Sequence, residues 1–165
     1  MKKLLLAGAA LALLPTGAFA QIEGQDLSFI ALSLHGDLAA IQEAQIARTN
    51  ASSPAVRSFA EHMIQDHSLN DQELAAMLKA AGIPLIPTSL SPAEVQQETN
   101  LRGLSGADFD RAYIQAQIAN SRHLQDVMQG EVQAGNDSNL KNFAQRSLTI
   151  TQDHIRAAQQ LLGTG

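Results

Sequence analysis

The chain of 165 residues has no cysteine and no tryptophan, one tyrosine and only five prolines. Without cysteine there is no disulfide, no thiolate chemistry and no thiolate-bound metal, and the lipid-attachment residue of a bacterial lipoprotein is missing too. Alanine, leucine and glutamine dominate the composition, and residues that favour strands are few. The composition therefore predicts an all-α protein.

Basic residues are also scarce. Removing Lys2 and Lys3, which belong to the leader described next, leaves nine Lys and Arg against 16 Asp and Glu, a net charge of about −7. Nucleic acids and anionic membrane surfaces both require a basic face, so neither is expected as a partner. No apolar run after the leader is long enough to span a bilayer, which argues against stable membrane insertion of the mature chain. The partner is unknown from sequence, and association with a second copy is left open.

Residues 1–20 have the pattern of a secretory signal peptide. Lys2 and Lys3 precede an apolar run over residues 4–14, and Ala18-Phe19-Ala20 is a small-x-small cleavage motif. We expect cleavage between Ala20 and Gln21 and a periplasmic or secreted protein; an uncleaved membrane anchor is the alternative. Residues 21–165 then form a single domain of ordinary size.

Apolar residues spaced by three and four predict four long helices, at about residues 26–49, 54–81, 105–134 and 138–162. Ser53 followed by Pro54, and the capping box Ser91-Pro92-Ala93-Glu94, mark two helix starts, the second opening a short helix to about residue 101. The connection between the second and third long helices is long enough to recross the whole bundle. We therefore predict a four-helix bundle of the ferritin-like type with a short helix in the crossover.

Three histidines, His67, His123 and His154, lie mid-helix on stripes expected to face the core. The stripes expected on the first and third long helices run through Leu27, Ala31, Leu34, Leu38 and Ile41, and through Phe109, Tyr113, Ala116, Asn120, His123 and Val127. A buried imidazole left without a partner costs about 1–3 kcal/mol, so each histidine needs a hydrogen bond or a metal. His67, His123 and His154 are thus the candidate site residues, with His35 and Asp66 as weaker candidates.

Two interpretations of these histidines stay open. One is a transition-metal site, since imidazoles from several helices with nearby carboxylates are how bundles hold metals. The carboxylates it could use are Asp66, Asp71, Asp126 and Asp153. The other is a buried hydrogen-bond network with Asn70, Asn120, Tyr113, Ser147 and Thr151 as partners.

Signatures of catalysis are missing. No histidine has an acidic residue three positions before it, as the usual di-iron centre requires, and there is no nucleophile elbow or phosphate-binding loop. The sequence assigns no catalytic residue and favours a role other than catalysis.

Several segments resemble a bacterial family catalogued as domain of unknown function 4142. They are Ser53-Pro54-Ala55-Val56-Arg57-Ser58-Phe59-Ala60, Met63-Ile64-Gln65-Asp66-His67, Phe109-Asp110-Arg111-Ala112-Tyr113, His123, Leu140-Lys141-Asn142-Phe143-Ala144 and Asp153-His154-Ile155. The resemblance covers roughly residues 27–162 and implies an exported, ferritin-like bundle.

Members of that family typically carry histidines at the places of His67, His123 and His154, which favours a functional site there. They also typically have glutamate around Ala40 and Gln42, whereas this chain has Glu43, expected on another face. The resemblance therefore implies that a carboxylate of the first helix is missing. Two functions remain: a metal-binding or redox-protective periplasmic bundle, and a non-enzymatic helical module acting in envelope stress or partner binding.

Overall fold

The computed structural model describes residues 22–163, which contain five helices and no strand. The helices are α1 (Gln25–Asn50), α2 (Pro54–Ala80), α3 (Pro92–Arg102), α4 (Gly106–Ala134) and α5 (Ser138–Gly163). All five lie close to the positions predicted from the sequence, and the all-α class is confirmed. The predicted signal peptide and its cleavage site lie outside the described residues.

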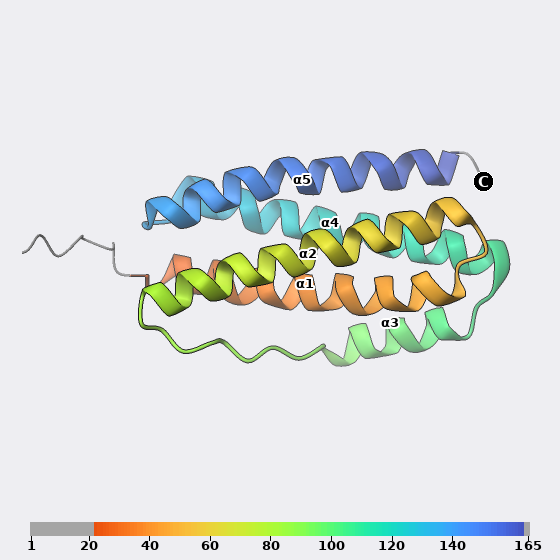
Figure 1. Cartoon of the computed structure of the whole chain (residues 1–165), viewed down its shortest axis with the longest axis horizontal. Helices are drawn as coiled ribbons and strands as arrows, with labels where there is room; N and C mark the ends of the chain where they lie inside the picture. The colour runs from red at the N-terminus through yellow and green to blue at the C-terminus, as the bar shows by residue number, and fades with distance from the viewer. Residues whose placement is uncertain (1–21, 164–165) are drawn as a thin grey trace, which may run out of the picture.

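Four long helices lie side by side, and the connection after α2 runs back along the full length of the molecule (Figure 1). α4 consequently begins at the end where α1 meets α2. Hydrogen bonds join these segments: Asp110 in the first turns of α4 accepts from the backbone N–H of Ser52 at 2.9 Å and of Ser53 at 2.8 Å. At the other end, Asp26 of α1 accepts from the backbone N–H of Asn136 between α4 and α5 at 2.7 Å.

Local signals set the helix ends. Ser91 and Glu94 form the predicted capping box at the start of α3, each side chain bonding the other residue's backbone N–H. Gly82 follows α2 with a φ of 71°, a conformation that glycine adopts without strain. Ser53, at the predicted start of α2, and Ser105, before α4, occupy N-cap positions, but neither side chain makes a capping hydrogen bond.

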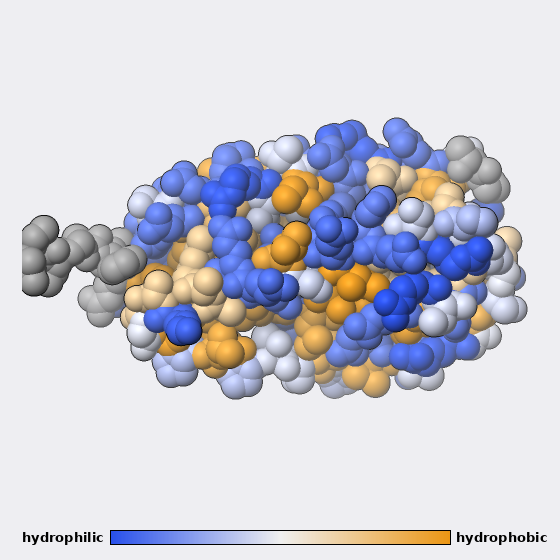
Figure 2. Space-filling model, in the orientation of Figure 1, coloured by the Kyte–Doolittle hydropathy of each residue, from blue (hydrophilic) through white to orange (hydrophobic). Residues whose placement is uncertain are grey.

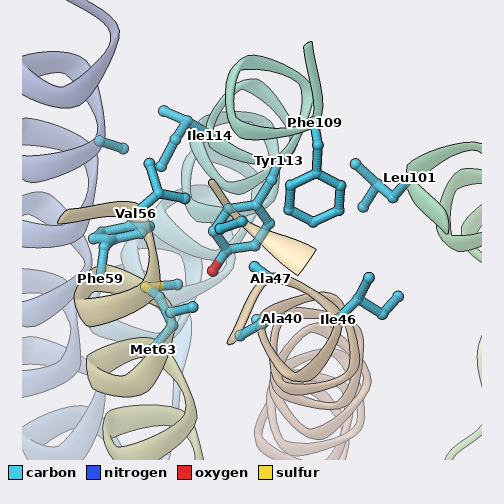
Figure 3. Packing of buried hydrophobic residues seen from close by; sticks show 14 of the residues in the cluster. Ala40, Ile46, Ala47, Val56, Phe59, Met63, Leu101, Phe109, Tyr113 and Ile114 are labelled. Carbon is cyan, nitrogen blue, oxygen red and sulfur yellow. The ribbon is translucent and has the colours of Figure 1, made fainter. Parts of the chain in front are cut away.

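The apolar core consists of two clusters. The first surrounds Tyr113, which stacks on Phe109 and meets Phe59 edge-on, with α1 below and Leu101 of α3 at the side (Figure 3). The second, towards the other end, packs Phe29 of α1 edge-on against Phe143 of α5. Burying such side chains gives about 1.5–3 kcal/mol each, which is the main source of stability in a bundle.

A polar layer separates the two clusters. On α2, His67 lies between Met63 of the first cluster and Leu74 of the second. On α5, the buried stretch from Ser147 to His154 lies between the clusters in the same way. Polar side chains there are almost fully enclosed, so they must satisfy one another or a ligand.

The predicted burial of His67 on α2 and of His154 on α5 is confirmed. The stripe expected on α1 is wrong, and the stripe expected on α4 is confirmed at Phe109 and Tyr113 but wrong from Ala116 onwards. On α4 the buried positions include Gln117, Ser121, Leu124 and Met128 in place of Ala116, Asn120, His123 and Val127, because the larger apolar side chains gain more from burial. On α1 the positions at regular three- and four-residue spacing that are almost fully buried are Ile30, Ser33, Asp37, Ala40, Ala44 and Ala47. The more apolar face that we expected to be buried is only partly covered.

Both hydrophilic and apolar residues lie on the surface. Hydrophilic residues predominate on the face in Figure 2, with apolar groups in separate patches. Exposed large apolar residues are distributed over four helices and two connecting segments: Leu32, Leu69, Leu85, Val95, Leu104 and Ile150. Among the described helices, none combines the length and the apolar character needed to cross a bilayer.

The close approach of α1 and α4 gives a first testable prediction. A Cβ atom on Gly36 would lie 2.6 Å from Cδ2 and 3.1 Å from Cγ of Leu124. Alanine in place of a mid-helix glycine normally stabilises by about 1 kcal/mol, but overpacking costs about 1–3 kcal/mol. We expect Gly36→Ala to lower the free energy of unfolding by about 1 kcal/mol, measured by urea denaturation.

The control is the same substitution in a Leu124→Ala background. The space released by the shortened side chain should reverse the sign, so that Gly36→Ala then stabilises. A stabilising effect in both backgrounds would show that Leu124 does not restrict the approach of the two helices.

Candidate functional site

His67 on α2 is buried and held by a carboxylate of α1. Its Nδ1 lies 2.6 Å from Oδ1 of Asp37, and the two residues are 2% and 0% exposed. An aspartate accepts a hydrogen bond when ionised, so Nδ1 of a neutral His67 is the protonated nitrogen. α1 therefore does supply a carboxylate to the histidine layer, one turn before the position that the family resemblance implied.

His154 on α5 has the same kind of support. Its Nε2 lies 2.8 Å from Oδ2 of Asp66 on α2, the residue directly before His67. The rings of His67 and His154 are 5.4 Å apart between centroids, with planes inclined by 42°. Three helices thus bring two imidazoles and two carboxylates together, and the partners of each hydrogen bond are far apart in the sequence.

One nitrogen of each ring is left over. Nε2 of His67 and Nδ1 of His154 are buried and have no hydrogen-bond partner among the described residues. Since the opposite nitrogen of each ring donates to a carboxylate, the free nitrogen of the neutral ring carries a lone pair. Burial, together with the neighbouring His67, lowers the pKa of His154, which favours this neutral form, while Asp66 opposes the shift.

Asp71, one turn further along α2, adds a third carboxyl group to the layer. The pKa of Asp71 is raised to about 7, by burial first and by the neighbouring Asp37 second, while His67 partly opposes the shift. One oxygen of each aspartate, Oδ1 of Asp71 and Oδ2 of Asp37, is buried without a hydrogen-bond partner. Two such close carboxyls cannot both ionise easily, so Asp71 holds a proton near neutral pH.

The prediction that His123 joins this layer is wrong. His123 is exposed, because Leu124, the next residue, faces the core and His123 is turned about 100° away from it. His35 is half-buried, and its Nε2 pairs with Glu94 on α3 at 3.0 Å instead of with the other histidines. Of the carboxylates considered, Asp66 and Asp71 reach the layer, whereas Asp126 and Asp153 are exposed.

The predicted network partners do not bond the two histidines: Ser147 and Thr151 lie in the layer, but the hydrogen bonds of His67 and His154 go to other residues. Asn70 accepts from Ser147 at 3.4 Å, and Asn120 donates to Glu43 at 3.2 Å. The hydrogen-bond partners of the two buried histidines are aspartates. Asp37 was missed because a helix covered on several sides does not need a hydrophobic inner face. The signal that could have found it is the run of small residues on the Asp37 face, which permits close helix packing.

A second polar cluster surrounds Glu43, which we expected on a different face. Glu43 is 1% exposed and accepts from the amides of Gln97 on α3 at 2.5 Å and of Gln117 on α4 at 2.6 Å. The pKa of Glu43 is raised to about 7, chiefly by burial. The carboxylates of Glu98 and Glu94 add to this rise, and the hydrogen bonds from Gln97 and Gln117 oppose it. Asp37 and Glu43 of α1 therefore lie in two separate polar environments.

A third cluster lies where α1 begins. Glu131 near the end of α4 and Asp26 are both 0% exposed, and both oxygens of Glu131 have no partner. Burial and the adjacent Asp26 raise the pKa of Glu131 to about 7. A Cβ on Gly135 would lie 2.2 Å from Oε1 of Glu131, so the glycine leaves room for that carboxyl group.

Within the described residues, no group of three or more His, Asp or Glu side chains is arranged to hold a metal ion by itself. Any metal in the histidine layer would therefore depend on the two imidazole nitrogens, with its remaining positions filled by smaller ligands. Imidazole is a donor suited to copper, zinc, iron and nickel.

A family model described as domain of unknown function 4142 matches residues 12–161. The chain belongs to this family. No curated protein matches the chain.

Three solved structures share the fold of this member of the family. A domain of unknown function 305 fragment from Deinococcus radiodurans is 17% identical, with a TM-score of 0.78, covering 87% of this chain and 99% of its own. A protein from Streptomyces coelicolor described as a secreted domain of unknown function 305 protein is also 17% identical, with a TM-score of 0.75 and coverages of 88% and 95%. A conserved hypothetical protein from Mycobacterium tuberculosis is 15% identical, with a TM-score of 0.68 and coverages of 86% and 92%. These similarities show a common helical bundle.

Proposed function

We propose that this chain is an exported, single-domain bundle of the ferritin-like type that binds one transition-metal ion through His67 and His154. The observation that carries the proposal is the state of the two rings: each is buried, each is fixed by an aspartate through one nitrogen, and each keeps the other nitrogen free. Metal-binding histidines almost always donate their second ring N–H to a carboxylate, a backbone carbonyl or water, which fixes the ring and raises its basicity.

The ring separation fits a shared ion. Metal–nitrogen bonds of about 2.1 Å place two imidazole centres roughly 5.3 Å apart at a tetrahedral angle and roughly 6.5 Å apart when linear. The centroids of His67 and His154 are 5.4 Å apart. With two protein ligands the ion keeps open positions, so the site suits binding and exchange of copper or zinc better than permanent structural ligation.

Export to the periplasm is the second part of the proposal. It is supported by the signal-peptide pattern of residues 1–20 and by a neighbour described as secreted. A structural likeness at 17% identity supports the fold alone, so the compartment rests mainly on the sequence pattern. Fractionation of cells, with mass spectrometry of the mature N-terminus, tests it; the expected first residue is Gln21.

The test of metal binding compares buried with exposed histidines in protein purified without a histidine tag. We expect about one equivalent of Cu²⁺ or Zn²⁺ in calorimetry and elemental analysis. His154→Gln should weaken binding at least tenfold while its amide still donates to Asp66. His123→Gln and His62→Gln are the matched controls, because both side chains are exposed, and they should bind as the parent does.

The alternative function is a non-enzymatic helical module whose histidines only hold the bundle together. The aspartate partners of both histidines, and the lack of a three-residue metal group in residues 22–163, favour it. Less than 0.1 equivalent of bound metal after loading would support this module and remove the metal proposal. Equal loss of binding in His123→Gln would also contradict our choice of ligands.

A further inference from the structure

The cluster around Glu43 contains more polar groups than its hydrogen bonds use. Glu43 accepts from the side-chain amides of three residues on two helices: Gln97, Gln117 and Asn120. Oε1 of Gln117 is buried without a partner, and Gln117 is 0% exposed. Oε1 of Glu98 on α3 is likewise buried without a partner. Each such atom costs about 1–3 kcal/mol when nothing compensates it.

The hydroxyl of Tyr113 is a third unused group. Tyr113 is 0% exposed, its oxygen has no partner, and its ring points inward between α1 and α2 (Figure 3). The charge of Glu43 acts directly on this hydroxyl and, after burial, is the second cause that raises the pKa of Tyr113. Unpartnered buried oxygens of α3 and α4 therefore belong to side chains that either bond Glu43 or act on it electrostatically.

The chemistry of these groups is that of a hard-cation site. In the structure the three amides direct N–H groups at Glu43, and rotation of each amide by half a turn would present its oxygen instead. The imidazole of His35 is held by Glu94. Two carboxylates and several amide oxygens are ligands that Ca²⁺ accepts in flexible six- to eight-fold coordination, whereas Mg²⁺ requires a stricter octahedron. The two carboxylates alone do not make a metal group of three acidic residues, so the amides must complete the set.

We propose that the side chains of Glu43 and Glu98 and the amide oxygens around them form a binding site for a hard divalent cation of the size of Ca²⁺. The amide ligands are Gln97, Gln117 and Asn120. The site is distinct from the histidine layer, because Glu43 follows Asp37 by six residues, about 9 Å along α1. Bound Ca²⁺ ties α3, which supplies Gln97 and Glu98, to the two long helices beneath it.

The composition of the chain allows a selective experiment. Tyr113 is the only tyrosine and there is no tryptophan, so light absorbed by tyrosine can sensitise Tb³⁺ emission only from this position. We expect Tb³⁺, a luminescent substitute for Ca²⁺, to emit strongly on excitation of Tyr113 and to be displaced by Ca²⁺. Ca²⁺ alone should raise the midpoint of thermal unfolding in a concentration-dependent way.

Variants separate this site from other acidic groups. Glu43→Gln should weaken Tb³⁺ binding at least tenfold, and Glu98→Gln, which changes a less buried carboxylate, provides a second test should Glu43→Gln unfold. Glu131→Gln is the matched control, because Glu131 is a buried carboxyl near the far end of α4, and it should leave emission unchanged. His154→Gln should also leave it unchanged, so failure of the histidine site and failure of this site are distinguishable.

Three results would overturn the proposal. They are Tb³⁺ emission no stronger than that of Tb³⁺ with free tyrosine, emission that Ca²⁺ does not displace, and equal binding by Glu43→Gln and the parent chain. Emission no stronger than that with free tyrosine would mean that Glu43 binds no cation and interacts only with a proton and with the three amides that donate to it.

Discussion

Replacement of His67 by leucine is expected to lower the free energy of unfolding by about 3–5 kcal/mol. The imidazole is the hydrogen-bond partner of Oδ1 of Asp37, and Asp37 is 0% exposed. Removing one partner of a buried pair leaves an uncompensated charge, which costs about this amount. The hydrophobic gain from leucine cannot offset it, because a buried apolar side chain contributes only about 1.5–3 kcal/mol. Urea denaturation monitored by far-ultraviolet circular dichroism provides the measurement.

The double variant Asp37→Leu with His67→Leu separates pairing from packing. Replacing both members by apolar side chains is often neutral, so most of the lost stability should return. His123→Leu is the surface control and should change stability by less than about 0.5 kcal/mol, since His123 is exposed. If His67→Leu were as mild as His123→Leu, Asp37 would not depend on the imidazole, and the candidate site would lose its support.

The second large effect is a loss of stability as the pH rises from about 5 to 8. Three carboxyl groups, on Glu43, Asp71 and Glu131, have a pKa raised to about 7 in the folded chain. A carboxyl whose folded pKa lies above its unfolded value stabilises the fold below the unfolded pKa, and this contribution disappears as the pH rises through 7. The lowered pKa of His154 has the opposite effect, because below about pH 6.5 it makes stability rise with pH. His154 is a single group, whereas three carboxyl groups lower stability as the pH rises.

Glu131→Gln isolates one of these groups outside both proposed metal sites. The groups that act on Glu131 are Asp26 and Asp137, which raise its pKa, and Lys141, which lowers it. The pKa shift from 4.5 to about 7 corresponds to about 3 kcal/mol, of which we expect about 2 after screening. At pH 8 the variant should therefore be about 2 kcal/mol more stable than the parent, and at pH 5 the two should be equal.

The measurement is a series of urea denaturations between pH 5 and 8 in the presence of a chelator. Glu61→Gln, at an exposed position of α2, is the control and should follow the parent at every pH. A Glu131→Gln curve that runs parallel to the parent curve would mean that Glu131 is ionised throughout and that Asp26 does not share its proton.

Most of the candidate site could be predicted from the sequence: His67, His154, Asp66 and Asp71 were all named as candidates, and Asp37 was not. His67 and His154 were assigned to the core correctly, because each lies between apolar residues at regular spacing on a helix with one clear inner face. His123 was assigned wrongly on the same argument. On α4 two neighbouring stripes are both partly apolar, and the one with Leu124 and Met128 is buried because it removes more apolar surface from water.

The acids of α1 could not be found in this way. α1 packs against α2, α3 and α4, so most of its circumference is covered and its hydrophobic pattern does not identify an inner face. Asp37 and Glu43 are compensated by partners that come from other helices, His67 on α2 and Gln97 and Gln117 on α3 and α4. Nothing near either acid in the sequence indicates those partners.

The sequence by itself determined where each helix begins and ends, because prolines, glycines and capping residues act within a single turn and need no distant partner. Only the tertiary structure decided which side chains meet. The pairing of Asp37 with His67, of Asp66 with His154 and of Glu43 with its amides depends on how each helix is rotated against its neighbours. That rotation is set by the packing of the whole core, which favours burial of the largest apolar side chains and leaves the buried polar groups to satisfy one another.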